Sequence, residues 1–105
     1  MGRYGDSVVT VAAPTDHDII ALRRGIRLQW EQHQQAWVIL FPEGMVTLND
    51  SASAILRLCQ DEVSVGTLIA TLQQQFPDAN LAADVREFLA TALQENWLVI
   101  TPDRL

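Results

Sequence analysis

The pattern of hydrophobic and polar residues in the first half of the chain predicts three β-strands. Residues Arg27–Glu31 alternate polar and apolar side chains, which is typical of a strand with one buried face. Ala36–Phe41 is a continuous apolar run that suits a central strand covered on both faces. Pro42–Gly44 predicts a turn, and Met45–Asn49 predicts a shorter third strand. Strands joined by such short connections form an antiparallel meander.

Apolar residues in the second half recur at the spacing of amphipathic helices and predict three of them. The residues able to cap the first two helices are Asn49, Asp50 or Ser51 for the first and Ser64 for the second. The apolar stripes are Ala52, Ile55, Leu56 and Cys59 in the first helix and Val65, Leu68, Ile69, Leu72 and Phe76 in the second. The third helix is predicted from about Leu81 to Asn96, and its inward-facing residues are Leu81, Val85, Phe88, Leu89, Ala92 and Leu93.

This order predicts an α+β fold in one domain, residues 23–105, with a three-stranded antiparallel sheet followed by a three-helix bundle. Trp97–Ile100 is expected to pack back onto the domain as a tail. Residues 1–22 differ, because a short β-branched run, Ser7–Ala13, ends at a proline and is followed by polar residues. We expect a loosely attached N-terminal arm. Its β-branched run could occupy an open sheet edge in its own molecule or in a neighbour.

The composition adds an acidic balance to this picture. The 105 residues carry a net charge of −6, and lysine is absent. An acidic surface opposes binding to nucleic-acid phosphates and to anionic membranes, so a partner with some basic character is favoured. No apolar run approaches the roughly 20 residues of a membrane span. The N-terminal residues lack the apolar stretch of a signal peptide, so we expect a cytoplasmic protein.

The residue types that carry catalysis or bind metals are too scattered to predict a site. His17 and His33 have no Cys-x-x-Cys or His-x-x-x-His partner, so no metal site is expected. Cys59 lies in an apolar helical run, which predicts a buried hydrophobic residue rather than a nucleophile. The five glycines form no phosphate-binding loop. We therefore expect no catalytic residues, no cofactor and no enzymatic activity.

The open edge of the predicted sheet offers a way to bind a peptide. An extended peptide can add a strand to such an edge, with backbone hydrogen bonds giving affinity and alternate side chains giving specificity. The candidate edge is the end of the meander, formed by Met45, Val46, Thr47 and Leu48. If the third helix runs beside that edge, a groove could have as its floor Val85, Phe88 and Leu89. The same side chains fit an ordinary core equally well.

A winged helix-turn-helix, which also joins strands to helices through short turns, is the alternative. Its recognition helix is normally basic. The third predicted helix instead has Asp84, Glu87 and Glu95 against a single Arg86, and each carboxylate would repel the phosphate backbone. A nucleic-acid-binding regulator is therefore the less favoured function.

Several short pieces of the sequence occur in a characteristic order and spacing. They are Arg24-Gly25-Ile26-Arg27-Leu28, the strand from Trp37 to Phe41 with Pro42-Glu43-Gly44, Leu48-Asn49-Asp50-Ser51-Ala52 with Ile55-Leu56, Val65 with Leu68-Ile69, a turn with Phe76, Asp84-Val85 with Phe88-Leu89, and Trp97-Leu98-Val99. Together they resemble the pyrroloquinoline quinone (PQQ) biosynthesis protein D family (PqqD) over roughly residues 23–100.

The resemblance implies a winged-helix-like recognition element for ribosomally made, modified peptides. Such a domain binds the precursor peptide as an added strand between its third strand and third helix. It presents the peptide to a radical SAM enzyme, which joins a glutamate and a tyrosine within it. By position, the peptide-contacting residues would be Met45, Val46, Thr47, Leu48, Asp84, Val85, Phe88 and Leu89. The resemblance leaves open whether the pathway makes PQQ or another modified peptide, and whether the protein forms a homodimer.

Overall fold

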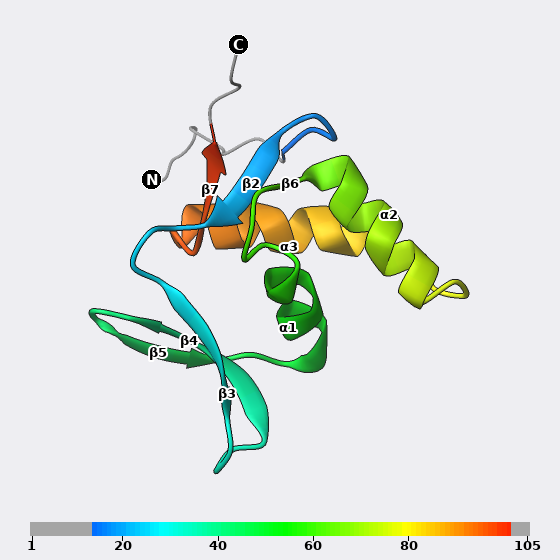
Figure 1. Ribbon diagram of the computed structural model, residues 1–105. Coiled ribbons are helices and arrows are strands. Elements are labelled where there is room, and N and C mark those ends of the chain that lie inside the picture. Colours follow the sequence, from blue (N-terminus) through cyan, green and yellow to red (C-terminus); the bar gives the residue numbers. More distant parts are fainter. Residues whose placement is uncertain (1–13, 102–105) are drawn as a thin grey trace, which may run out of the picture.

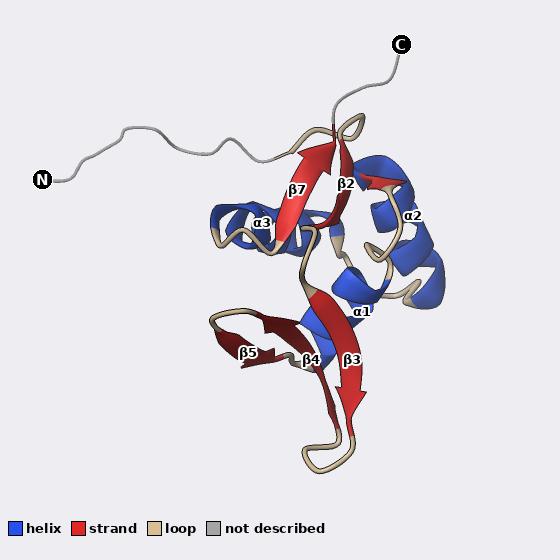
Figure 2. Cartoon of the chain, turned by 60° about the vertical axis from the view of Figure 1, so that its left-hand side comes forward, coloured by secondary structure: helices blue, strands red, loops and turns tan. Residues whose placement is uncertain are grey.

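The computed structural model describes residues 14–101 of the chain. In chain order its elements are β2 (Ile19–Leu22), β3 (Arg27–Glu31), β4 (Ala36–Phe41), β5 (Gly44–Thr47), α1 (Asp50–Arg57), β6 (Val63–Ser64), α2 (Val65–Gln75), α3 (Ala82–Gln94) and β7 (Leu98–Thr101). The strands form two three-stranded sheets at opposite ends of the molecule, with the helices between and beside them (Figure 1 and Figure 2). The predicted α+β class is confirmed.

The first sheet is the predicted meander, with the strand order β3-β4-β5. β3 and β4 have the bounds that the sequence predicts, and both strand pairs are antiparallel. Residues directly opposite each other share a face, so the register places Leu28, Ile39 and Val46 together on the face that packs on the core. β5 is the last strand of this sheet.

Trp37 of β4 makes contacts both within this sheet and with α1. Trp37 of β4 lies opposite Trp30 of β3, and their ring centroids are 5.9 Å apart in an edge-to-face arrangement. The guanidinium of Arg57, at the end of α1, lies 4.8 Å from the centroid of the Trp37 ring. The first contact joins two strands of the sheet, and the second joins the sheet to α1 through β4, the strand that pairs with β5.

The second sheet was not predicted. Its strand order is β6-β2-β7, and both pairs are antiparallel. The expectation of one sheet is therefore corrected. β6 has only two residues, and both partners of β2 follow it by more than forty positions in the sequence, so no local pattern indicates the pairing. The predicted tail is confirmed, since it returns as β7.

The N-terminal arm is corrected for residues 14–22. Ile19–Leu22 is the central strand of the second sheet, and Ile20 is completely buried. These residues belong to the folded domain because their strand pairs on both sides and contributes to the core. The β-branched run Ser7–Ala13 lies outside the described residues, so the role predicted for it stays a prediction.

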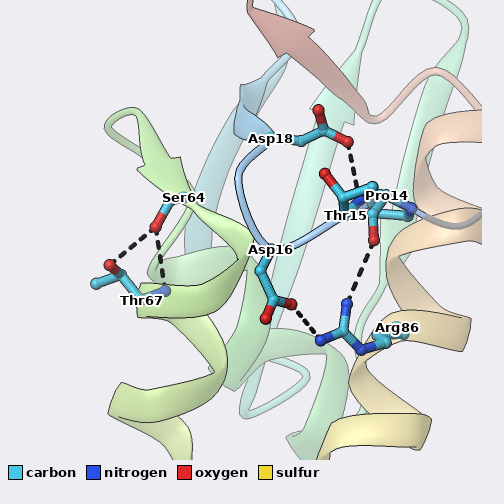
Figure 3. Close-up of polar contacts among 7 residues, drawn as sticks. All are labelled: Pro14, Thr15, Asp16, Asp18, Ser64, Thr67 and Arg86. Atoms are coloured by element: carbon cyan, nitrogen blue, oxygen red, sulfur yellow. Dashed lines mark hydrogen bonds and ion pairs between the residues drawn. The ribbon is translucent and has the colours of Figure 1, made fainter.

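Polar contacts attach residues 14–18 to two helices (Figure 3). Arg86 of α3 donates a hydrogen bond to the Pro14 carbonyl at 3.3 Å and forms an ion pair with Asp16. The backbone N–H of Gly66, at the start of α2, donates to the Asp16 carbonyl at 3.0 Å. The turn before β2 is closed by the Thr15 N–H, which donates to the Asp18 carboxylate at 2.9 Å. The chain therefore enters β2 along a fixed path.

The first two helices begin at the predicted caps. The Asn49 side chain accepts a hydrogen bond from the Ala52 N–H at 2.8 Å, and the Ser64 hydroxyl accepts one from the Thr67 N–H at 3.1 Å. α3 has no side-chain cap; the Leu81 carbonyl accepts the first helical hydrogen bond, from the Val85 N–H at 2.9 Å. Acidic residues lie in the first turns of α1 and α3, where they interact favourably with the helix dipole.

One hydrophobic core joins both sheets to the three helices. Its completely buried members include Ile20, Ile39, Leu56, Leu68 and Leu89. Phe76 departs from expectation: the sequence places it on the inward stripe of the second helix, but its side chain is 48% exposed. α2 ends at Gln75, so Phe76 no longer follows the helical stripe.

Replacing Ile20 tests whether β2 is part of the folded unit. Ile20→Ala should lower the free energy of unfolding by roughly 2–4 kcal/mol, because a buried side chain is lost and a cavity remains. Ile100 is the matched control, since it lies directly opposite on β7 and is 47% exposed. Ile100→Ala should cost roughly 1 kcal/mol or less. Urea unfolding would compare them, and equal small losses would contradict the integration of β2.

Candidate peptide-binding site

β5 leaves one side of its backbone without a partner strand. Within residues 14–101 it pairs only with β4. The Leu48 N–H donates to the Trp37 carbonyl at 2.9 Å, which sets the alternation of the ladder. Val46 and Leu48 therefore direct their backbone groups toward β4, whereas Met45 and Thr47 direct theirs outward. The outer edge of β5 thus offers N–H and C=O groups from two residues to an added strand.

The side chains of β5 and Leu48 point to two faces of the sheet. Val46 lies on the inner face and is half-buried, and Leu48 is buried, with 6% of its surface exposed. Met45 and Thr47 lie on the outer face, where Met45 is 47% exposed. An added strand would have one row of side chains on the inner side, next to the helices, and one row on the outer side.

The predicted residues of α3 divide between surface and core. Asp84 is exposed, and Phe88 is half-buried with its ring centroid 6.4 Å from that of Trp97. Val85 and Leu89 are buried, and Leu89 has no exposed surface. Leu89 and Leu48 are therefore core residues, whereas Asp84 and Phe88 reach the surface of the molecule.

A pocket of about 380 Å³ lies where the starts of α1 and α3 meet the end of α2. Three of the predicted site residues line it: Asp84, Val85 and Phe88. The other lining residues are Asn49, Asp50, Ser51, Ala52, Ala54, Ile55, Leu72, Phe76, Ala79 and Leu81. The wall is mainly apolar, and it begins where the chain leaves β5 and enters α1.

A second hollow, of about 330 Å³, lies at the other end of β5. The end of β4 contributes Phe41 and the following turn Glu43, the segment before β3 contributes Arg23, and the loop after α3 contributes residues 95–97. β5 therefore starts near the C-terminal end of α3 and leads toward its N-terminal half. The two hollows mark the ends of a path along β5 and α3 that an extended peptide could follow.

Comparisons with known proteins show which family the chain belongs to. The family model for coenzyme PQQ synthesis protein D (PqqD) matches residues 36–98. The chain belongs to the PqqD family. The resemblance drawn from the sequence is confirmed.

Two relatives of this PqqD-family chain carry the name PqqA binding protein. The one from Kluyvera intermedia is 46% identical over 84 residues, which are 79% of this chain and 91% of the relative. The one from Klebsiella pneumoniae strain 342 is 49% identical over 81 residues, 76% of this chain and 88% of the relative.

A solved structure shares the fold. It is the solution NMR structure of the PqqD truncation of Methylobacterium extorquens PqqCD, with a TM-score of 0.68 and 31% sequence identity, covering 83% of this chain and 95% of that one. That PqqD is described as a functional, stand-alone recognition element for ribosomally synthesised and post-translationally modified peptides.

The sequence pattern does not indicate the part of the pocket that comes from α1 and α2. Asp50 and Ile55 of α1, and Phe76 after α2, join the wall formed by α3. Ile55 and Phe76 were assigned to apolar stripes, and such stripes do not show which members lie at a surface hollow. The exposed Phe76 ring becomes informative only once the end of α2 is placed against α3.

Cys59 is placed as predicted, in the core. Its side chain has no exposed surface, and burial raises the pKa of its thiol from 9.0 to about 12. The buried thiol therefore stays protonated near neutral pH, whereas a reactive cysteine needs an accessible thiolate. Within the described part of the chain, no three His, Cys, Asp or Glu side chains are grouped to hold a metal ion. No helix in that part is long and apolar enough to cross a membrane.

Burial of Cys59 gives a pH-dependent contribution to stability. The folded pKa lies above the unfolded one, so the contribution is fully present below about pH 9 and is lost as the pH rises toward 12. The free energy of unfolding should fall more steeply over this range for the native chain than for Cys59→Ala. If denaturant titrations at several pH values gave the same fall of the free energy of unfolding with pH for both chains, the burial of Cys59 would be contradicted. At pH 8, a thiol reagent should modify Cys59 rapidly only after unfolding in guanidinium chloride.

Proposed function

We propose that this PqqD-family chain is a peptide chaperone of pyrroloquinoline quinone biosynthesis. It binds the ribosomally made precursor peptide as an added strand on β5 and presents it to a radical SAM enzyme that modifies it. The names of the relatives support the peptide as ligand, because both are PqqA binding proteins. The solved structure of similar fold supports the role of a recognition element.

The observation that carries this proposal is the outer edge of β5, which has no partner strand within residues 14–101 and lies near an apolar pocket. The outward backbone groups of Met45 and Thr47 can form hydrogen bonds with any extended peptide. Specificity then requires side-chain contacts. The peptide residues that point inward would meet Phe88 and the pocket next to it, and Asp84 at the pocket entrance.

The expected affinity follows from the size of these contacts. Each fully buried aliphatic side chain contributes roughly 1.5–3 kcal/mol. Two or three such side chains, less the cost of ordering the peptide and of association, correspond to micromolar or somewhat tighter binding. Val85, Leu48 and Leu89 would contribute by holding the floor of the site in place.

The remaining features of the proposal concern the fold, the chemistry and the partners. The chain acts without catalysis and without a cofactor of its own, and β4 and β5 form the wing of a winged-helix-like layout. The modifying enzyme is a separate protein in the cytoplasm.

A nucleic-acid-binding role is disfavoured by Asp84, Glu87 and Glu95, which place acidic charge along α3 and its C-terminus.

A proline at position 47 tests strand addition directly. Thr47→Pro removes an outward N–H while leaving the hydrogen bonds to β4 intact, because Val46 and Leu48 supply those. Affinity for the precursor peptide, measured from amide shifts on titration, should fall at least about tenfold, which combines a lost hydrogen bond with a disturbed register. In the native chain the shifts should concentrate on residues 45–48 and 84–89.

Thr47→Val is the matched control. Thr47 donates a side-chain hydrogen bond to Gln34 at 2.7 Å, and both variants lose it, but valine keeps the backbone N–H. The valine variant should bind almost as well as the native chain. Equal affinities for the proline and valine variants, with both proteins folded, would argue against an added strand at this edge.

A further inference from the structure

The pocket between α1 and α3 combines an apolar interior with acidic groups at its entrance. Ile55 and Val85 form buried parts of the wall, and Phe88 is half-buried beside them. Asp50 and Asp84 also line the pocket, and both are exposed. The cavity is thus lined with hydrocarbon below and with carboxylates at its solvent-facing side.

The charge at the entrance is not balanced within the pocket. None of the lining residues is basic. Across residues 14–101, the ion pair of Arg86 is made with Asp16, and neither Asp50 nor Asp84 forms one. Each carboxylate lies in the first turn of its helix, where the dipole offsets part of its charge. Two full negative charges against two partial positive ones still leave a negative potential over an apolar cavity.

We propose that this pocket anchors one lysine or arginine side chain of the bound peptide. This inference rests on the proposed function and adds the residue class that the site selects. The aliphatic stem lies along Ile55, Val85 and Phe88, and the cationic group lies at Asp50 and Asp84. Long basic side chains pack in this way, with the stem on apolar surface and the charge in water.

Other side chains complement the pocket less well. A carboxylate would be repelled by Asp50 and Asp84, and an aliphatic side chain would leave both without a counter-ion. The half-exposed ring of Phe76 adds a surface over which a cation is attracted. Water occupies roughly 30 Å³ per molecule, so a pocket of about 380 Å³ holds a long side chain with water around its charged end.

A double-mutant cycle between protein and peptide tests this anchor. Calorimetry would measure binding of the cognate precursor peptide, and of versions in which each lysine or arginine in turn is replaced by norleucine, to the native chain and to the double variant Asp50→Asn/Asp84→Asn. Norleucine keeps an aliphatic stem and removes the charge. At low salt, one replacement should weaken binding to the native chain roughly two- to fivefold, the upper part of the range of an exposed ion pair.

The same norleucine replacement should have little effect on binding to the double variant. That variant already lacks the carboxylates with which the basic group of the peptide would interact. Exchanging lysine for arginine, or arginine for lysine, at that position should preserve binding, because either residue carries a positive charge on an aliphatic stem. Glu87→Gln is the control, since it removes one carboxylate from an exposed position of α3 that does not line the pocket. It should show no coupling to the anchor position.

The outcomes separate the anchor from the function on which it rests. If the native chain binds the peptide but no basic position couples to Asp50 and Asp84 more strongly than to Glu87, the anchor is wrong and the chaperone role stands. If the native chain does not bind the peptide at all, the proposed function is wrong as well. Amide spectra of the variants would establish that each remains folded.

Discussion

The proposed function of this structure depends on the backbone N–H and C=O groups of Met45 and Thr47, which point outward from β5. An edge strand is normally covered, shortened or charged to prevent unwanted pairing. β5 is short, and its residues carry no charge. Its open side lies near the apolar pocket of α1 and α3, so an added strand gains both backbone hydrogen bonds and side-chain burial. The proposed peptide binding depends on both features: the backbone groups of β5 would hold the peptide, and the pocket would select among its side chains.

The second sheet makes this edge usable because it fixes the helix that faces it. α3 packs on β7, β7 pairs with β2, and β2 leads directly into β3 of the first sheet. Arg86 ties the opposite part of α3 to Pro14 and Asp16 at the entry to β2. α3 is thus attached at two places to the end of the molecule that holds the second sheet, while β5 is held through β4 and Trp37. A peptide that bridges β5 and α3 would meet two preformed walls, which lowers the ordering cost of binding.

The extent to which sequence predicted this structure depends on how local each signal is. The alternation in Arg27–Glu31 and the capping side chains of Asn49 and Ser64 act within a few residues, and they gave correct elements. Ile19–Leu22 is too short to show a pattern, and its partners lie far along the chain, so it was assigned to a loose arm.

The candidate site shows the same limit. The edge position of β5 follows from the order of the meander and was predicted. The pocket needs Ile55, Phe76 and Val85 from three separate helices, and no spacing within one helix indicates which apolar residues meet at the surface. The family resemblance supplied the function from the order of short motifs, but it did not indicate the acidic entrance of the pocket.

Hydrogen exchange at β5 tests the central claim most directly. In the free chain the amides of Val46 and Leu48 face β4, whereas those of Met45 and Thr47 face outward. Saturation with the precursor peptide should slow exchange at Met45 and Thr47 selectively, since an added strand accepts hydrogen bonds from these two amides. Unchanged exchange at both amides in the saturated complex would show that the peptide binds elsewhere.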